Sequence, residues 1–135
     1  MIKTKFKDLF TIQNKSFKDN RGYFKEIIRE EKINKKFPFL VMSFSKKNVI
    51  RGLHLQKKKS QGKFVSVIKG KIFDVAVDLR KNSKTFGQYY QCTLSEKNSK
   101  QFIFHQDLHM VFKHLKMKII LFIVALNIDI LKVKK

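Results

Sequence analysis

The segment GKFVSVIKGKIFDVAVDLR, residues 62–80, constrains the fold most strongly, because its apolar side chains alternate with other residues over most of its length. Period-two alternation that is rich in β-branched side chains is typical of β-strands. The dipeptide Lys69-Gly70 interrupts the pattern, and glycine favours a reversal of the chain there. The sequence therefore predicts a hairpin whose two strands meet at this turn.

The alternation also assigns side chains to the two faces of each strand. In the first strand, Val65 and Val67 share a face, and the other face carries Phe64, Ser66 and Ile68. In the second strand the apolar face carries Phe73, Val75, Val77 and Leu79. The other face is polar and carries Asp74, Ala76 and Asp78. We expect the apolar set to pack.

Other short segments have the same strand character, and no helical period is sustained before residue 105. The further strand candidates are residues 22–29, 39–44, 49–56, 88–94 and 101–104. Residues 30–36 could form one or two helical turns, and turn residues lie at 19–22 and 81–83. Many short strands separated by turns indicate an all-β barrel or sandwich.

The composition is that of one packed domain. A length of 135 residues suits a single unit, and 43% hydrophobic residues with 14 Phe indicate a real core. Cys92 is the one cysteine, and no leader precedes the first polar residues, so we expect a reducing cytoplasmic location. The apolar run 119–126 is too short to cross a membrane, which takes about 20 residues.

The net charge of +21 raises the possibility of nucleic-acid binding. However, only four of the 31 cationic side chains are arginine, and the lysines are spread along the whole chain. Base readout favours arginine and interleaved aromatic residues. We therefore predict no nucleic-acid partner, and interpret the charge as a lysine-rich surface whose positive field would attract a small anionic substrate.

The motif RGLHLQ, residues 51–56, holds the first candidate for chemistry. On a strand, His54 shares a face with Gly52 and Gln56. An imidazole in a barrel interior can act as a general base, bind a metal, or fill space with its nitrogens hydrogen-bonded. Lys63 opens the next strand, where an ammonium near His54 would stabilise an oxyanion formed beside a carbonyl, although its spacing alone does not distinguish it from the other lysines of the chain.

A metal site is the other possibility for a small β-barrel that contains histidines. The four histidines are His54, His105, His109 and His114, and none forms an HxH pair with a downstream ligand on a strand. The sequence therefore predicts no metal.

Longer motifs carry a resemblance to a known family. SFSKKNVIRGLHLQ, followed by QGKFVSVIKGKIFDVAVDLRKNSKTFG, together with DNRGYFKE at residues 19–26, closely resembles the dTDP-4-dehydrorhamnose 3,5-epimerases. The resemblance covers roughly residues 5–104. It implies a cupin-like jelly-roll barrel, usually dimeric, that uses no metal or organic cofactor and inverts C3 and C5 of a nucleotide-linked 4-keto-6-deoxy sugar in surface-polysaccharide synthesis.

The resemblance also implies roles for particular residues. His54 would be the base that removes the proton next to the C4 ketone, and Lys63 would hold the resulting enolate. The resemblance assigns substrate-binding roles to Arg51 and Gln56 of the RGLHLQ motif. It also assigns such roles to Arg21, Phe24 and Glu26 of DNRGYFKE, a segment that in the family often contributes to the cleft of the neighbouring subunit.

Residues 105–135 do not continue the family pattern. Family members continue with a proline-glycine turn, an Ala-His-Gly-Phe motif, and a strand with the tyrosine that reprotonates the enolate. Codons for residues 105–112, read one base earlier, permit Pro-Gly-Phe-Ala-His-Gly-Phe, and the codons of Met110 and Val111 force GGT, a glycine codon, at its second glycine. The same shift across residues 113–129 permits a family-like strand with its tyrosine.

We therefore expect residues 1–104 to be an epimerase-like core and residues 105–135 an out-of-frame tail that leaves the barrel incomplete at its C-terminus. Low stability and negligible epimerisation would follow, because missing strands expose unpaired edges. The alternatives are a noncatalytic cupin-like remnant or nucleotide-sugar binding module and, third, a basic nucleic-acid binder.

Overall fold

The computed structural model describes residues 1–33, 37, 39–54, 62–104, 109–114 and 120–127; for residues 39, 53, 54 and those beyond 104 it describes only the backbone. The elements in this part of the chain are β1 (Ile2–Lys3), β2 (Leu9–Gln13), β3 (Ser16–Asp19), β4 (Gly22–Lys25), α1 (Glu30–Ile33), β5 (Phe39–Ser45), β6 (Ile50–His54), β7 (Gly62–Lys69), β8 (Lys71–Val77), β9 (Tyr89–Ser95), β10 (Lys100–Phe104), β11 (His109–His114) and β12 (Ile120–Asn127).

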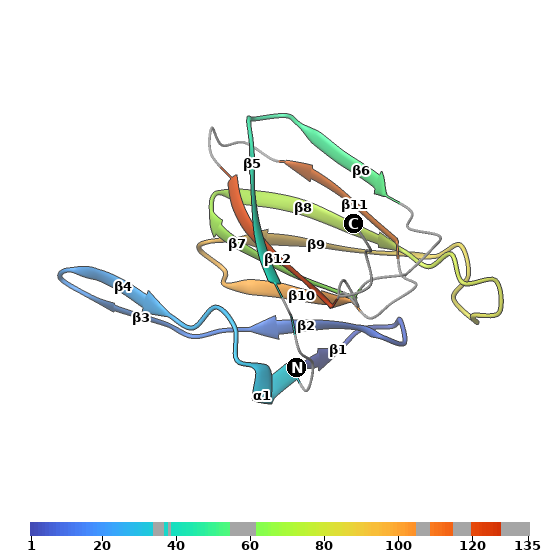
Figure 1. Cartoon of the computed structure of the whole chain (residues 1–135), viewed down its shortest axis with the longest axis horizontal. Helices are drawn as coiled ribbons and strands as arrows, with labels where there is room; N and C mark the ends of the chain where they lie inside the picture. Colours follow the sequence, from blue (N-terminus) through green and yellow to red (C-terminus); the bar gives the residue numbers. More distant parts are fainter. Residues whose placement is uncertain (34–36, 38, 55–61, 105–108, 115–119, 128–135) are drawn as a thin grey trace, which may run out of the picture.

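Two antiparallel sheets face each other, and a separate two-stranded ribbon projects from them (Figure 1). One sheet has the order β1-β2-β10-β7-β12-β5, and the other has the order β6-β11-β8-β9. Strands far apart in sequence lie side by side in both sheets, as in a jelly roll. The all-β prediction is confirmed, and the short helix α1, of four residues, lies inside the predicted segment 30–36.

The predicted strands at residues 62–80 exist, but the prediction that they pair as a hairpin is wrong. β7 pairs with β10 and β12, whereas β8 pairs with β9 and β11 in the other sheet. Gly70 has a φ of 91°, a left-handed conformation that glycine adopts without strain, and the chain crosses there from one sheet to the other. This crossing makes the two strands opposite walls of the same interior.

The expected assignment of faces in β8 is also wrong. The set that the sequence marks as polar is buried: Asp74, Ala76 and Asp78 have no exposed surface. Phe73, Val75 and Val77 are only half-buried on the other face. Because Ile72 and Ala76 belong to the core between the sheets, Asp74 between them must face the same interior.

The core has two parts, separated by the six-stranded sheet. Val65, Phe102 and Phe104 belong to the cluster between the sheets, where the rings of Phe102 and Phe104 pack edge to face at 5.5 Å. Phe64 and Ile103, with the opposite strand parity, pack against Ile33 of α1 on the other side of that sheet. Alternation along β7 and β10 thus supplies both clusters.

Both strands beyond residue 104 lie within the sheets. β12 pairs with β7 on one side and β5 on the other, and β11 pairs with β8 and β6. Strand pairing uses backbone N–H and C=O groups, which every residue except proline provides in full. The presence of β11 and β12 therefore does not test whether residues 105–135 are translated out of frame. The division of the chain at Phe104, and the out-of-frame origin of residues 105–135, stay predictions.

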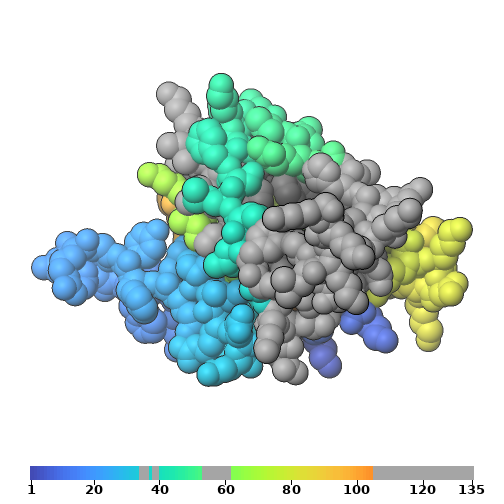
Figure 2. Space-filling view, in the orientation of Figure 1, coloured from blue at the N-terminus to red at the C-terminus, as the bar shows by residue number. Residues whose placement is uncertain are grey.

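The N-terminal strands β1, β2 and β3 are absent from the sequence prediction, and the strand predicted over 22–29 ends at Lys25. Among the strands that the structure describes, β3 and β4 pair only with each other, and they project from the body as an arm (Figures 1 and 2). No helix within the described residues is long and apolar enough to cross a membrane.

Candidate active site

The RGLH motif lies on β6, an edge strand of the four-stranded sheet. Gly52 in this strand has a φ of 134°, a value that side-chain-bearing residues rarely adopt. Arg51 is hydrogen-bonded to β5, the strand that precedes β6 in the sequence. Its Nε donates to Ser45 Oγ at 2.7 Å, and its Nη2 donates to the Phe44 carbonyl at 3.0 Å. These bonds tie the start of the motif to the end of β5.

His54 is the last residue of β6, where the backbone places it at a defined register position. It lies opposite Met110 of β11, and Met110 lies opposite Ala76 of β8. β7 and β8 run in opposite directions away from the turn at Gly70. Lys63 lies seven residues before this turn and Ala76 six residues after it, so Lys63 and Ala76 lie at the same end of the sandwich, far from the turn. The backbone thus brings positions 54 and 63 to one end of the interior.

Lys63 is the predicted site residue whose surroundings are best described. It shares its strand parity with Val65 and Val67, which belong to the core between the sheets, and its side chain is partly buried. Burial lowers the pKa of the Lys63 ammonium, and the nearby charge of Asp74 opposes this decrease. A cation that faces the interior of a sandwich is suited to hold a negatively charged oxygen there.

Asp74 is a site residue that the sequence analysis missed, because it was assigned to a solvated face. Its side chain is fully buried, and neither carboxyl oxygen has a side-chain hydrogen-bond partner within the described residues. Burial raises the pKa of Asp74 well above its usual value, whereas the Val75 N–H and, to a smaller extent, the Lys63 charge act in the opposite direction. The sequence signal was the DVAVD pattern, which puts carboxylates on one face of a strand with a small residue.

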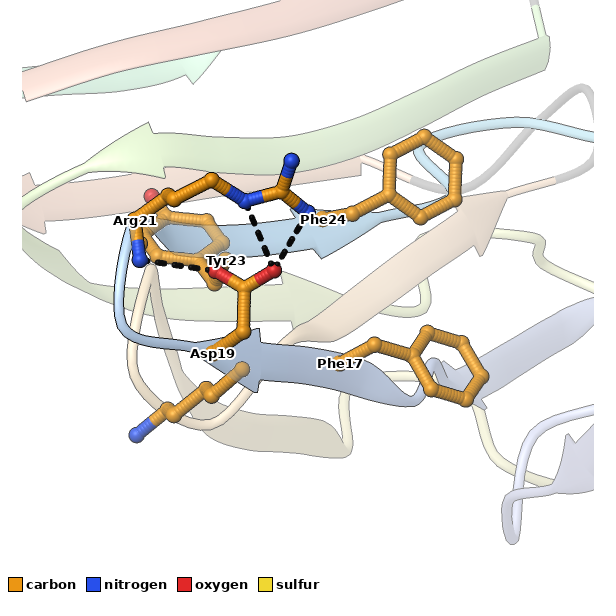
Figure 3. A pocket seen from close by; sticks show the side chains of 7 residues that line it. Phe17, Asp19, Arg21, Tyr23 and Phe24 are labelled. Atoms are coloured by element: carbon orange, nitrogen blue, oxygen red, sulfur yellow. Dashed lines mark hydrogen bonds and ion pairs between the residues drawn. The ribbon is translucent and has the colours of Figure 1, made fainter.

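The arm carries two other predicted residues, Arg21 and Phe24, around an open hollow of about 390 Å³ (Figure 3). Arg21 Nη2 donates to Asp19 Oδ2 at 2.7 Å, and the guanidinium lowers the pKa of Asp19. Phe24 is 72% exposed, opposite Phe17 of β3, which is 62% exposed. Exposed aromatic rings beside an arginine are suited to contact a planar, anionic ligand.

Glu26 lies just after the arm and is engaged by cations of its own segment. Its carboxylate forms ion pairs with Arg29 and, at 3.1 Å, with Lys32, and the hydrogen bond from Lys32 contributes most to lowering its pKa. Its backbone carbonyl accepts a hydrogen bond of 2.7 Å from Asn14 Nδ2. In this single chain, Glu26 is thus paired locally.

The structure therefore groups the predicted residues in two places. Positions 54 and 63 lie at one end of the sandwich interior, with Arg51 at the start of β6. Arg21 and Phe24 lie on the projecting arm. Gln56 falls outside the described residues. Within the described part, no cluster of three or more His, Cys, Asp or Glu side chains could hold a metal ion.

Comparisons with known proteins agree with this architecture. The family model described as dTDP-4-dehydrorhamnose 3,5-epimerase matches residues 3–124. A dTDP-4-dehydrorhamnose 3,5-epimerase of Methanothermobacter thermautotrophicus is 44% identical over 106 residues, which are 75% of this chain and 57% of that protein. The chain thus spans less than two thirds of the length of this curated relative.

Solved structures give the same result. A crystal structure of dTDP-4-dehydrorhamnose 3,5-epimerase from Elizabethkingia anophelis is 39% identical with a TM-score of 0.83, over 94% of this chain and 73% of that chain. A Legionella pneumophila dTDP-6-deoxy-D-glucose-3,5-epimerase, in complex with dTDP-4-keto-L-rhamnose, is 37% identical with a TM-score of 0.86, over 94% and 70% of the two chains. The cupin-like fold predicted from the sequence is confirmed, and the chain belongs to the dTDP-4-dehydrorhamnose 3,5-epimerase family.

Proposed function

We propose that this protein has the fold and proton-transfer site of an isomerase that inverts C3 and C5 of a nucleotide-diphospho-4-keto-6-deoxy sugar, in deoxysugar synthesis for surface polysaccharides. One observation carries the proposal: the partly buried ammonium of Lys63 faces the sandwich interior at the end where β6 places position 54. The Legionella relative, crystallised with dTDP-4-keto-L-rhamnose, supports this substrate class.

The chemistry follows from the acidity of carbons next to a ketone. The His54 imidazole takes the proton from C3 or C5, and the electron pair of the broken C–H bond moves into an enolate with negative charge on the C4 oxygen. The Lys63 ammonium stabilises that oxygen by a charge-assisted hydrogen bond. A proton then returns to the opposite face of the carbon. The cycle is redox-neutral and calls for no cofactor or metal.

The nucleotide-sugar substrate would be held by Arg51 and Gln56 of the RGLHLQ motif and by Arg21, Phe24 and Glu26 of the segment DNRGYFKE. In one chain, the arm projects away from the sandwich (Figure 2). Its exposed Phe17, Tyr23 and Phe24 fit the proposal of a homodimer in which each arm serves the partner's cleft. The net charge of +21 would attract the anionic substrate.

For the chain as it stands we expect binding without appreciable turnover. Residues 105–135 lack the Ala-His-Gly-Phe motif and the reprotonating tyrosine that the family resemblance implies. Without a group on the opposite face, an abstracted proton returns to the face it left, and no inversion results. This feature favours the alternative of a nucleotide-sugar binding module for the unmodified chain.

Solvent exchange tests the proposal. The chain is compared with a second version in which residues from 105 onward are replaced by the translation of the shifted frame. Each is incubated in D₂O with dTDP-4-keto-6-deoxyglucose, and deuterium at C3 and C5 is measured by NMR. We expect inversion at C3 and C5, accompanied by rapid exchange, only in the restored version, and about 100-fold or greater loss of both there on His54→Ala.

Two results would contradict the proposal. Rapid exchange and inversion by the unmodified chain would show that residues 105–135 are not limiting. Absence of both dTDP binding, measured by calorimetry, and exchange in the restored version would refute the assigned function. Phe24→Ser tests the arm: we expect weaker dTDP binding and a smaller dimer fraction by light scattering, whereas Phe86→Ser, another exposed aromatic residue, should change neither.

A further inference from the structure

A hollow of about 510 Å³ lies between the segment that precedes β2 and the loop that follows β8. Both segments lie at the end of the sandwich far from the turn at Gly70 (Figure 1). At that end, Leu9 of β2 is opposite Phe104 of β10, and Phe104 is opposite Lys63 of β7. The hollow is thus separated from the strand of Lys63 by β10, and its described lining includes no residue to which the proposed reaction assigns a role.

Cationic side chains line this hollow from both sides. Lys5 and Lys7 come from the segment before β2, Arg80 and Lys84 come from the loop after β8, and Asp8 is the acid among the described lining residues. Asp8 is already engaged, because its Oδ2 lies 3.0 Å from Arg80 Nη1. In the part of the chain that the structure describes, no ion pair joins Lys5, Lys7 or Lys84 to an acidic side chain. Three exposed ammonium groups therefore border one hollow without counter-charges of their own.

The backbone that carries these lysines is held in place by hydrogen bonds. Arg80 Nη2 donates to the Lys7 carbonyl at 3.2 Å, which ties the two walls of the hollow together. In the N-terminal wall, the Thr4 hydroxyl donates to the Leu9 carbonyl at 2.9 Å and accepts from the Phe6 N–H at 3.1 Å. A site whose backbone is already ordered loses less conformational entropy when a ligand binds. On binding an anion, the lysines would need to order only their side chains.

We propose that this hollow binds a diphosphate group, whose oxygens accept charge-assisted hydrogen bonds from Lys5, Lys7 and Lys84. Lysine binds phosphate as a compact charge with three rotatable N–H donors. A diphosphate spreads its negative charge over two phosphoryl groups, so it can meet both walls of the hollow at once. Arg80 contributes its charge more than its donors, because its N–H groups are already bonded to two carboxylates and a carbonyl.

The ligand is defined by this shared chemistry, which free pyrophosphate and the diphosphate of a nucleotide both provide. The site does not depend on the proposed isomerase function. None of the three lysines has a role in the proton transfer, and all three lie in segments that the resemblance does not assign to the substrate cleft. The binding of a diphosphate here can therefore be measured in the chain as it stands, without turnover.

The test measures the binding of pyrophosphate by isothermal titration calorimetry. The chain is compared with the triple variant Lys5→Gln, Lys7→Gln, Lys84→Gln. We expect the variant to lose about tenfold or more in affinity, because it lacks three charge-assisted hydrogen bonds to the anion. Circular dichroism checks that the variant is folded, and if it is not, Lys84→Gln alone decides.

The matched control removes the same charge from the opposite end of the sandwich. Lys69 and Lys71 flank Gly70, and Lys97 follows Glu96, whose N–H donates to the Gly70 carbonyl at 3.1 Å. All three lysines are exposed. The control variant Lys69→Gln, Lys71→Gln, Lys97→Gln should change the affinity for pyrophosphate by about threefold or less, because distant exposed charges are screened by salt.

Acylation of lysines, read by mass spectrometry, locates the bound anion. Pyrophosphate should protect Lys84 from acylation and leave Lys97 as reactive as before. Protection of Lys84 by dTDP alone would identify the ligand as a nucleotide diphosphate. Protection by pyrophosphate that persists in protein saturated with dTDP would identify it as free diphosphate.

Three results would overturn the inference: no binding of pyrophosphate, equal losses of affinity in the two triple variants, or orthophosphate binding as tightly as pyrophosphate. The proposed function fails on different evidence. Pyrophosphate binding that depends on Lys84, with no dTDP binding at the proposed cleft and no isotope exchange in the version with the restored frame, would uphold this site and refute that function.

Discussion

Arg80 holds Asp78 through two parallel hydrogen bonds, Nε to Oδ1 and Nη2 to Oδ2, each of 2.8 Å. Asp78 is fully buried at the end of the β8 segment, and its Oδ2 also accepts bonds of 2.6 Å from the hydroxyls of Ser83 and Thr85. Arg80 Nη1 reaches Asp8 Oδ2 at 3.0 Å. One carboxylate thus organises the loop after β8 and links it to the N-terminal segment.

Replacing Asp78 should therefore be costly. Asp78→Asn leaves the geometry nearly unchanged but removes the charge opposite Arg80, and breaking a buried ion pair costs about 3 kcal/mol or more. Asp8→Asn is the matched control, because Asp8 is more exposed and a pair of that kind contributes about 1 kcal/mol or less. Urea unfolding measures both. Equal losses in the two variants would show that the burial of Asp78 is unimportant.

The same carboxylate predicts how stability depends on pH. Arg80, followed by the Ser83 and Thr85 hydroxyls, holds the pKa of Asp78 far below its usual value in the folded chain. A lowered folded-state pKa stabilises the protein above the unfolded value of about 4, and this contribution is lost as the pH falls below it. We expect the free energy of unfolding to decrease from pH 5 toward pH 3, and to decrease less in Asp78→Asn. Parallel curves for the two proteins would contradict this account.

Gln101 should be the most sensitive uncharged polar residue of the core. Its Nε2 donates to the Ile27 carbonyl at 2.7 Å and to Ser66 Oγ at 3.0 Å, and its Oε1 accepts from Asn14 at 3.1 Å. Gln101→Leu keeps the size but leaves the buried Ser66 hydroxyl and the half-buried Ile27 carbonyl without this partner, at a cost of about 2–4 kcal/mol in urea unfolding. Gln91→Leu, at an exposed position on β9, should change stability by about 0.5 kcal/mol or less.

Local alternation was sufficient to predict where β5, β7, β8, β9 and β10 lie, because period two records which side chains of a strand share a face. It could not predict which strands pair. Lys69-Gly70 is equally compatible with a hairpin and with the observed crossing between sheets, since both need a turn with positive φ at Gly70. The choice is made by β10 and β12, which arrive from later in the chain to flank β7.

The same limit explains the misassigned face of β8. Valine and phenylalanine outnumber polar residues on the Phe73 face, so hydrophobicity alone favours burying it, yet the crossing at Gly70 points Asp74 and Asp78 inward. Asp78 tolerates burial because Arg80 neutralises it. Lys63, in contrast, was identified only through the family motif, because nothing in its local pattern distinguishes it from other strand lysines.

The last prediction concerns the reading frame of residues 105–135 and its effect on the stability of the larger sheet. β12 lies between β7 and β5 in the larger sheet, so its side chains help determine whether that sheet closes properly. If the gene's codons from 105 onward, read one base earlier, encode Pro-Gly-Phe-Ala-His-Gly-Phe and then the family-like strand, restoring that frame should raise the urea midpoint and the soluble yield. A version with residues 105–135 shuffled in order serves as the control. Stop codons in the shifted frame of the native DNA would refute the prediction. Equal urea midpoints for the restored and shuffled chains would also refute it, because we expect only the restored strand to present side chains that match both neighbouring strands.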